Sequence, residues 1–321
     1  MSAPRVGLVL GAGGPVGHAY HSGVLTAIEE ATGWDPRDAE IVVGTSAGSV
    51  VGASLRAGAS VSDLYAGAVG DTLSSEGARL LRAFRTVVPE PPDDVSRVRR
   101  GMAAPALLAR AALRPLSTRV GSLAAAALPP GRIPVQPVAA GFAALFPEGW
   151  PDRPLWICAV RLDRGRRVVF GRQDAPSAAV ADAVAASCAI PAYYRPVDIG
   201  GVRYVDGGVH SPTNADVLAG LGLDLVIVSS PMSAARGSFR PAFDLTPRAA
   251  WHLRLSQEAR KIRRAGTPVV ALEPGASVRR VMGLNGLDRR RRGPVAAQAR
   301  DSALRWIARS GLLEVLRVRT A

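Results

Sequence analysis

The chain has 321 residues, of which 48% are hydrophobic, and its mean hydropathy is +0.14. That much apolar material can build a sizeable core and excludes an intrinsically disordered chain. The formal net charge is +14, and Lys261 is the one lysine among 40 basic residues. An arginine-rich composition of this kind can follow from nucleotide bias, so the global charge alone does not indicate an acidic partner.

The two cysteines, Cys158 and Cys188, belong to no CxxC pair and no Cys/His cluster. The sequence therefore predicts no disulfide and no metal site, and no cofactor is expected. The apolar run after Arg5 meets Gly11 before it reaches the length of a signal peptide, and no run is long enough to span a bilayer. We therefore expect a cytoplasmic protein.

In chain order, the first expected elements are a strand over 6–10, a glycine-rich loop over 11–17 and a helix over 18–31. The loop contains the G-x-G spacing of dinucleotide-binding proteins. However, no acidic residue that could hold a ribose ends the next strand, over 41–43. We favour an oxyanion hole, in which loop amides face a developing negative charge. His18 and His21 follow the loop and are expected to shape the mouth of the site.

The strand over 41–43 leads into Gly44-Thr45-Ser46-Ala47-Gly48, and a small-residue helix follows. A G-x-S-x-G corner between strand and helix exposes the serine hydroxyl, and its glycines avoid collisions where the two elements pack closely. Amides at the start of the helix favour negative charge at this point. Glycine-rich turns without a function share the pattern, so Ser46 is a candidate nucleophile that needs a base.

The next part of the chain is less regular. Helices are expected over 50–59 and 63–81, and prolines then break the stretch 86–154 into short pieces. We interpret 86–154 as a cap of short helices over the site that could supply an apolar acyl channel, with a plain structural elaboration as the alternative.

Regular structure resumes after this stretch. The expected elements are strands over 155–160 and 168–170, a helix over 178–187, an extended segment over 189–197, and strands over 225–228 and 269–272. Asp206 stands at a strand end before Gly207-Gly208, a pattern that is usually a turn. The alternation of strands and helices predicts a mostly parallel sheet.

Several of these motifs, in this order, resemble the patatin-like phospholipases. They are the loop Gly11-Ala12-Gly13-Gly14, Gly23-Val24-Leu25 after it, the elbow at Ser46, Asp206-Gly207-Gly208, and the segments 186–191, 196–206 and 282–288. The resemblance covers 6–60 and 155–300, and leaves out the proline-broken middle. It implies one three-layer α/β/α domain over 1–321, with a mostly parallel central sheet and 86–154 as a helical cap insertion.

The resemblance also implies an activity: hydrolysis of carboxylic esters in phospholipids or related acyl lipids through an acyl-enzyme. Ser46 would be the nucleophile and Asp206 its single general base. The oxyanion hole would come from the backbone amides of Gly11, Ala12, Gly13 and Gly14. Many relatives carry a basic residue where this chain has Val16, and Pro15 has no N–H to donate, which bears on efficiency rather than on reaction type.

Two alternatives stay open at this stage. His210 and His252 follow Asp206 in the chain, so a Ser-Asp-His triad is conceivable, although its usual fold places several strands before the elbow and here there is one. The other alternative is a non-catalytic protein that binds lipid or nucleotide through the glycine loop. The expected partner is an acyl lipid, and the sequence leaves the oligomeric state open.

Basic residues are concentrated over 236–300, with 15 basic and 4 acidic side chains. Over 248–264, helical spacing places apolar Trp251, Leu255, Ala259 and Ile262 on one face and Arg254, Arg260, Lys261 and Arg264 on the other. With Arg279, Arg280 and 289–292, this predicts peripheral contact with an anionic membrane. The alternative is an ordinary helix with a solvated basic face. No nucleic-acid partner is expected, because the chain is 5% aromatic and carries no such motif.

Overall fold

The computed structural model describes residues 4–82, 102–105, 107–108, 120–234, 245–310, 312 and 316. Within them the strands are β1 (Val6–Leu10), β2 (Ile41–Thr45), β3 (Leu155–Arg161), β4 (Arg166–Phe170), β5 (Val197–Ile199), β6 (Val202–Asp206), β7 (Leu225–Ser229) and β8 (Val269–Leu272). The helices are α1 (Gly14–Thr32), α2 (Ala47–Arg56), α3 (Val61–Val69), α4 (Ser75–Arg82), α6 (Val120–Ala127), α7 (Gln136–Leu145), α8 (Val180–Cys188), α9 (Leu245–Arg264), α10 (Ala276–Met282) and α11 (Arg292–Ile307). The 3-10 helices used below are η3 (Gly207–Val209), η4 (Ala215–Leu218) and η5 (Arg289–Arg291).

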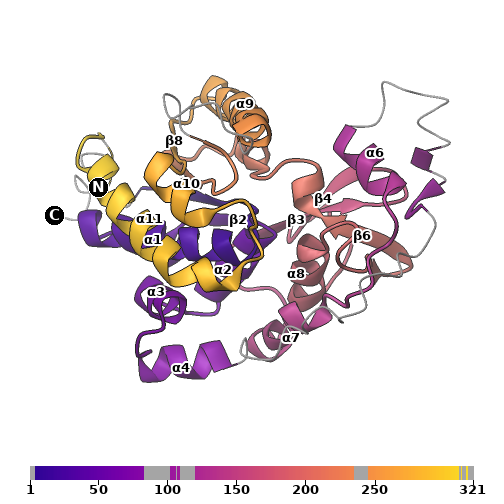
Figure 1. Cartoon of the computed structure of the whole chain (residues 1–321), viewed down its shortest axis with the longest axis horizontal. Helices are drawn as coiled ribbons and strands as arrows, with labels where there is room; N and C mark the ends of the chain where they lie inside the picture. The colour runs from indigo at the N-terminus through magenta and orange to yellow at the C-terminus, as the bar shows by residue number, and fades with distance from the viewer. Residues whose placement is uncertain are drawn as a thin grey trace.

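The strands form one mixed sheet in the order β5-β6-β3-β2-β1-β7-β8, with β4 also paired to β3. From β3 to β8 every neighbouring pair is parallel, whereas β4 and β6 run antiparallel to β3 and β5 runs antiparallel to β6. The expected parallel sheet therefore describes the centre, and an antiparallel part completes one side (Figure 1).

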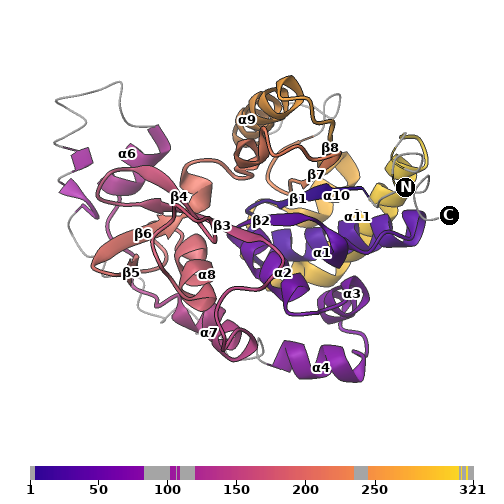
Figure 2. The same ribbon diagram turned by 180° about the vertical axis from the view of Figure 1, so that it is seen from behind.

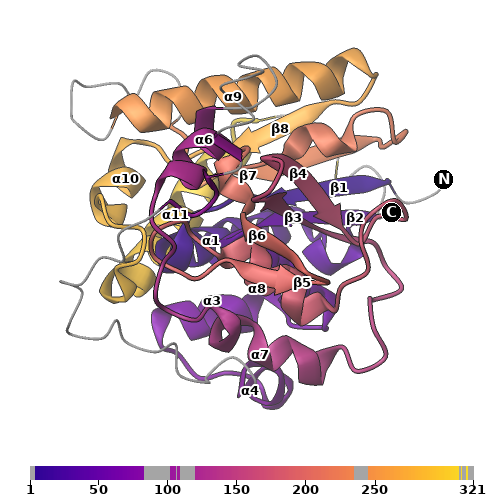
Figure 3. The ribbon, with the colours of Figure 1, turned by 90° about the vertical axis from the view of Figure 1, so that its right-hand side faces the viewer.

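Helices cover both faces of this sheet. Leu8 and Leu10 of β1 join the apolar core under α1, α2 and α11, while Val9 between them joins the core under α9. This division follows from the strand's period of two, because successive side chains point to opposite faces. Figure 3 shows α9 on one side of the sheet and α1, α3 and α8 on the other. The predicted α/β/α architecture is confirmed.

Seen from behind, α7 and α8 lie beside the β3–β6 half of the sheet, and α1 and α3 lie beside the β1–β2 half (Figure 2). The single helix expected over 63–81 is two helices, because Gly70 ends α3 in the left-handed region at φ 89°. Across the described parts of the chain, none of the helices has both the length and the apolar character needed to cross a bilayer.

Candidate active site

Ser46 lies at the corner between β2 and α2, with φ 53° and ψ −119°. A non-glycine residue with positive φ is strained and persists only where its surroundings enforce it. Two glycines allow this corner. A Cβ on Gly48 would collide with the carbonyl group of Leu10, and one on Gly44 would lie 2.5 Å from the Cα of Ser49. The predicted elbow is therefore present, and its serine is 4% exposed.

The backbone of Ser46 is held by hydrogen bonds. Its amide donates to the Ser187 hydroxyl at 2.8 Å, and that hydroxyl donates to the carbonyl of Cys158 at 2.7 Å. The carbonyl of Ser46 accepts from the amide of Ser49 at 2.8 Å and from its hydroxyl at 2.7 Å. The backbone N–H and C=O of Ser46 are therefore both engaged, and the residue lines the cavity.

Asp206 ends β6 and brings its carboxylate to the same place. Its Oδ1 accepts from the amide of Gly208 at 2.7 Å, and the side chain of Ser46 lies close enough to interact with the carboxylate. Burial raises the pKa of Asp206 to about 6, and the interactions with Ser46 and Gly208 oppose part of that rise. A carboxylate with this pKa is a stronger base than an ordinary aspartate and is still ionised at neutral pH.

The glycine loop between β1 and α1 borders the site, but its four predicted donors are not equivalent. The amide of Gly11 donates to the carbonyl of Ser229 at 3.0 Å, and that of Ala12 donates to the carbonyl of Pro212 at 2.8 Å. Both amides are therefore committed to neighbouring strands and loops, which corrects their assignment to the oxyanion hole.

Gly13 and Gly14 remain as candidate donors, because neither amide donates to any other described residue. Their backbone requires glycine: a Cβ on Gly13 would lie 2.7 Å from the Cα of Gly17, and Gly14 has φ 60°. Of the four amides predicted to form an oxyanion hole, these two remain candidates. Val16 lines the cavity with an apolar side chain.

His18 and His21 do not shape the mouth of the site, because neither lines the cavity; His21 is completely buried and His18 is half-buried. In His21, Nε2 lies 2.8 Å from the Gly11 carbonyl and Nδ1 lies 2.8 Å from the Ser229 hydroxyl. Burial lowers the pKa of His21 to about 4, so the ring is neutral. A carbonyl only accepts, hence Nε2 carries the proton, and His21 braces the loop.

The other two histidines also lie away from the reacting groups. His252 on α9 pairs with Glu273 at 2.8 Å. His210 follows η3, and neither it nor His252 is among the cavity-lining residues. The groups that lower the pKa of the Asp206 carboxyl are Ser46 and Gly208, and neither histidine is among them.

Ser46 and Asp206 open onto a cavity of about 620 Å³. Apolar side chains make up most of its wall: Ala12, Val16, Ile190, Pro191, Val209, Pro212, Pro231, Met232, Pro247, Trp251, Met282, Leu284 and Leu287. The charged side chains on this wall are Asp206 and Arg248, and Arg248 Nη1 donates to the carbonyl of Pro231 at 2.8 Å. A space of this size and polarity suits an acyl chain next to one anionic group.

The expected cap does not supply this wall within the described part of 86–154. There, α7 packs beside α8, and α6 lies against η3, where a Cβ on Gly121 would collide with the Val209 carbonyl. The rest of the predicted cap lies outside the described residues. Apart from the glycine loop and segment 208–212, the cavity wall comes from segments 190–191, 231–232, 247–251 and 282–287.

Sequence reasoning missed the residues that hold the site in place, namely Ser187, Ser229 and Asn214. Ser187 lies in the segment 186–191 that carries the family resemblance, but the sequence around it gives no sign that its hydroxyl bonds to the Ser46 amide. In the described parts of the chain, no group of three or more His, Cys, Asp or Glu side chains could hold a metal ion.

Comparison with known proteins identifies the family of the chain. A family model described as patatin-like phospholipase matches residues 8–219. No curated protein matches the chain significantly. Similar solved structures include VipD from Legionella pneumophila, with TM-score 0.44 and 14% identity over 98% of this chain and 67% of that one.

Another is the type III effector ExoU, with TM-score 0.36 and 16% identity over 98% of this chain and 54% of that one. A third is the heterodimeric ExoU-SpcU complex of Pseudomonas aeruginosa, with TM-score 0.39 and 17% identity over 98% of this chain and 53% of that one. This chain spans from about half to two thirds of these longer chains. Because the family model matches well over half of its residues, the chain belongs to the patatin-like phospholipase family, which supports a lipid acyl hydrolase activity.

Proposed function

We propose that this protein hydrolyses carboxylic ester bonds of phospholipids or related acyl lipids through an acyl-enzyme on Ser46, with Asp206 as the single general base. One observation carries the proposal: the Ser46 side chain and the buried Asp206 carboxylate lie together on the wall of one apolar cavity, close enough for Ser46 to lower the pKa of Asp206. A nucleophile, a base of raised pKa and a space for an acyl chain are what such a reaction needs.

In the proposed first step, Ser46 Oγ attacks the ester carbonyl carbon while its proton passes to Asp206. The tetrahedral intermediate collapses, its bond to the leaving alcohol breaks, and Asp206 returns the proton to that alcohol. In the second step, a water molecule attacks the acyl-enzyme and gives its proton to Asp206. The fatty acid then leaves, and the proton goes back to Ser46.

The negative charge on the tetrahedral oxygen needs donors that are already in place. The amides of Gly13 and Gly14 suit this role, since they border the cavity and make no other bond to described residues. The start of α2 adds the positive end of a helix dipole next to Ser46.

The proposed substrate carries an acyl chain and an anionic group. The chain would lie along the apolar wall, and Arg248 would meet a phosphate or carboxylate. The carbonyl of Pro231 holds one end of the guanidinium in place. Such a substrate class includes anionic phospholipids and lysophospholipids.

The surface that we propose for membrane contact is the rim of the cavity, rather than the basic face of α9. Leu255, Ala259 and Ile262 of α9 pack on the sheet, while Arg254 pairs with Glu258 and Lys261 with Asp216. Two of the basic side chains on the face predicted from the sequence are therefore already paired with carboxylates of this chain.

At the rim, Leu284 is 81% exposed, and Arg289 and Arg290 are exposed close by in the chain. An exposed leucine next to exposed arginines suits the interface of an anionic bilayer.

Labelling with a fluorophosphonate probe tests the proposal, with a substrate panel of phospholipids, lysolipids, acylglycerols and short p-nitrophenyl esters. The proposal expects labelling of wild type that disappears in Ser46→Ala, together with release of fatty acid from at least one lipid. A protein that binds lipid in the cavity without being labelled would support the non-catalytic alternative.

A further inference from the structure

We propose that Asn214 is a positioning residue for the dyad, because its side-chain amide ties the segment that carries Ser46 to the peptide unit that holds Asp206. The inference rests on the proposed function, since it concerns the same two groups. Asn214 lies between η3 and η4 and is completely buried. It has φ 52°, in the left-handed region that asparagine tolerates better than most residues.

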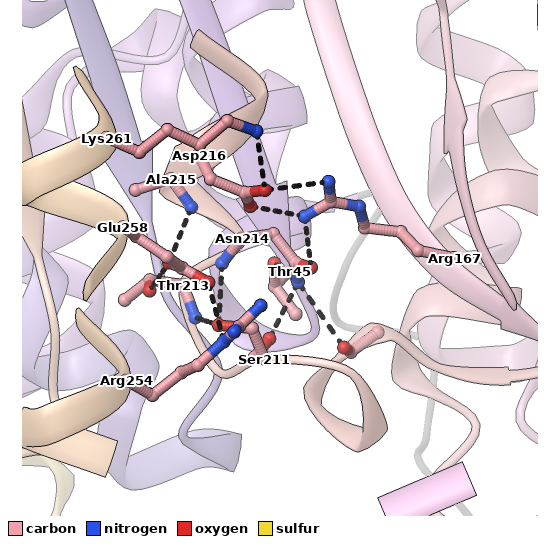
Figure 4. A network of polar contacts seen from close by, with 11 residues as sticks. Thr45, Arg167, Ser211, Thr213, Asn214, Ala215, Asp216, Arg254, Glu258 and Lys261 are labelled. Carbon is pink, nitrogen blue, oxygen red and sulfur yellow. Dashed lines mark hydrogen bonds and ion pairs between the residues drawn. The ribbon is translucent and has the colours of Figure 1, made fainter. Parts of the chain in front are cut away.

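The orientation of the Asn214 amide is set by its charged neighbours. Arg167 Nη1 lies 3.2 Å from Asn214 Oδ1, and a guanidinium can only donate, so the oxygen must face Arg167 and the NH₂ group must face the other way. Asp216 holds Arg167 by two bonds, at 2.5 and 3.1 Å, and Lys261 joins the same carboxylate at 3.4 Å. Figure 4 shows this network.

The NH₂ group of Asn214 faces the catalytic segments. Three oxygens lie within hydrogen-bonding distance of Nδ2: Thr45 Oγ1 at 3.1 Å, Gly207 O at 3.3 Å and Ser211 O at 2.6 Å. Thr45 directly precedes Ser46, and Gly207 directly follows Asp206. One buried amide therefore contacts the backbone or side chain next to each member of the dyad.

The contact with Gly207 reaches Asp206 through a single peptide plane. The carbonyl of Gly207 and the amide of Gly208 belong to the same planar unit. That amide donates to Asp206 Oδ1 at 2.7 Å. The Gly207 carbonyl also accepts from the amides of His210 at 3.0 Å and Ser211 at 3.2 Å. The bond from Asn214 is therefore the side-chain restraint on this peptide unit, and it adds to these two backbone bonds in aiming the Gly208 N–H at the carboxylate.

Other groups around these residues complete the setting. The Asp206 carboxylate is faced by Ser46 from the elbow and by Cys188 from α8. On the side of α9, Glu258 accepts from the Thr213 hydroxyl at 2.6 Å and from the Ala215 amide at 2.9 Å, so it holds the chain on both sides of Asn214. Arg254 pairs with this glutamate at 3.1 Å.

The variant Asn214→Gly removes the amide and keeps a backbone that is unstrained at φ 52°. We expect kcat on a soluble p-nitrophenyl ester to fall by about 10- to 100-fold with little change in KM, because the reacting groups lose alignment. A weaker Gly208 bond also makes Asp206 harder to ionise. The acid limb of the kcat profile should therefore move to higher pH, by roughly half a unit to one unit.

Thr213→Val is the matched control. It removes a buried hydrogen bond of the same network, between Thr213 and Glu258, without touching Thr45 or Gly207. Its Tm should fall, while kcat and the pH midpoint stay near those of wild type. If Asn214→Gly lowers only Tm, as this control does, Asn214 is structural and the inference is wrong.

Two further measurements test the inference if the glycine variant does not fold or if activity cannot be measured. Asn214→Ala lacks the donor and adds no charge, so it should show the same pH shift if the glycine variant does not fold. The pKa of Asp206 can also be read without any activity, from the aspartate carboxyl ¹³C resonance that is missing in Asp206→Asn. An unshifted resonance in both Asn214 variants would overturn the inference, whereas an inactive, unlabelled wild type would instead refute the proposed function.

Discussion

The amide of Ser46 donates to the hydroxyl of Ser187 at 2.8 Å, so the end of α8 holds the strained corner of the elbow. Both residues are buried, and the Ser187 hydroxyl donates a hydrogen bond to the Cys158 carbonyl on β3. The conformation of the candidate nucleophile therefore depends on a residue far from it in the chain.

Ser187→Ala should destabilise the fold and slow turnover together. It leaves the Ser46 amide and the Cys158 carbonyl without this partner in a buried setting, which costs about 1–3 kcal/mol. Ser122→Ala is the matched control, since Ser122 is buried and its hydroxyl donates to the Gly165 carbonyl, outside the cavity wall. Thermal unfolding and ester hydrolysis measure both. If the two variants lose the same stability and have the same turnover, Ser187 has no specific role in the reaction.

Ser46→Ala should abolish ester hydrolysis and probe labelling, because the substitution removes the attacking oxygen. The expected loss in kcat is on the order of 10⁴-fold or more. Circular dichroism should be unchanged. Hydrolysis at the wild-type rate by the alanine variant would show that another group is the nucleophile.

Asp206→Asn should reduce turnover about as severely, whereas His210→Asn and His252→Asn should have mild effects. The raised pKa of Asp206, about 6, also sets the pH dependence. The base works only when ionised, so activity should be full above this pKa and fall as the pH drops through it. A pH profile of kcat on a soluble ester checks this. A collapse of activity in either histidine variant would move the assignment to a triad.

Arg248→Gln should change which substrates are preferred. We expect KM for an anionic lysophospholipid to rise by about tenfold, since a charge-assisted contact is lost, while KM for a neutral p-nitrophenyl ester stays the same. Arg260→Gln, an exposed change on the same helix, serves as the control. A parallel change for both substrates would mean that Arg248 supports the wall rather than the head group.

The membrane proposal is tested with vesicles. The double variant Arg289→Gln and Arg290→Gln should bind anionic vesicles less than wild type does, since each basic residue near such a surface contributes about 1 kcal/mol. Leu284→Asp should weaken binding further. Co-sedimentation at about 0.05 and 0.5 M salt should show binding that falls with ionic strength. Wild-type binding that is equal on zwitterionic vesicles, or indifferent to salt, would contradict the proposal.

Much of the fold follows from local sequence signals. The strands at 6–10, 225–228 and 269–272 are apolar runs bounded by turns, and the elbow is marked by its own glycines, so each could be predicted within a residue or two. The antiparallel side of the sheet could not, because strand direction depends on which partner a strand meets.

In the candidate site, too, some residues could be predicted from the sequence and others could not. Ser46 and Asp206 carry motifs, whereas the use of the Gly11 and Ala12 amides depends on carbonyls at Ser229 and Pro212, about two hundred residues later. A glycine-rich loop offers several amides, and only the three-dimensional neighbours decide which of them stay available. The contacts of Asn214 are hidden from sequence for the same reason.

In the sheet, Thr45 pairs with Cys158 and Asp206 pairs with Ala159, which are consecutive residues of β3. The two members of the proposed dyad therefore lie at the ends of strands that flank one central strand. The apolar walls belong to other segments, at 190–191, 231–232, 247–251 and 282–287. Under the proposed function, substitutions in those walls would change the preferred acyl-chain length while Ser46 and Asp206 keep their spacing, so selectivity could be altered separately from the chemistry.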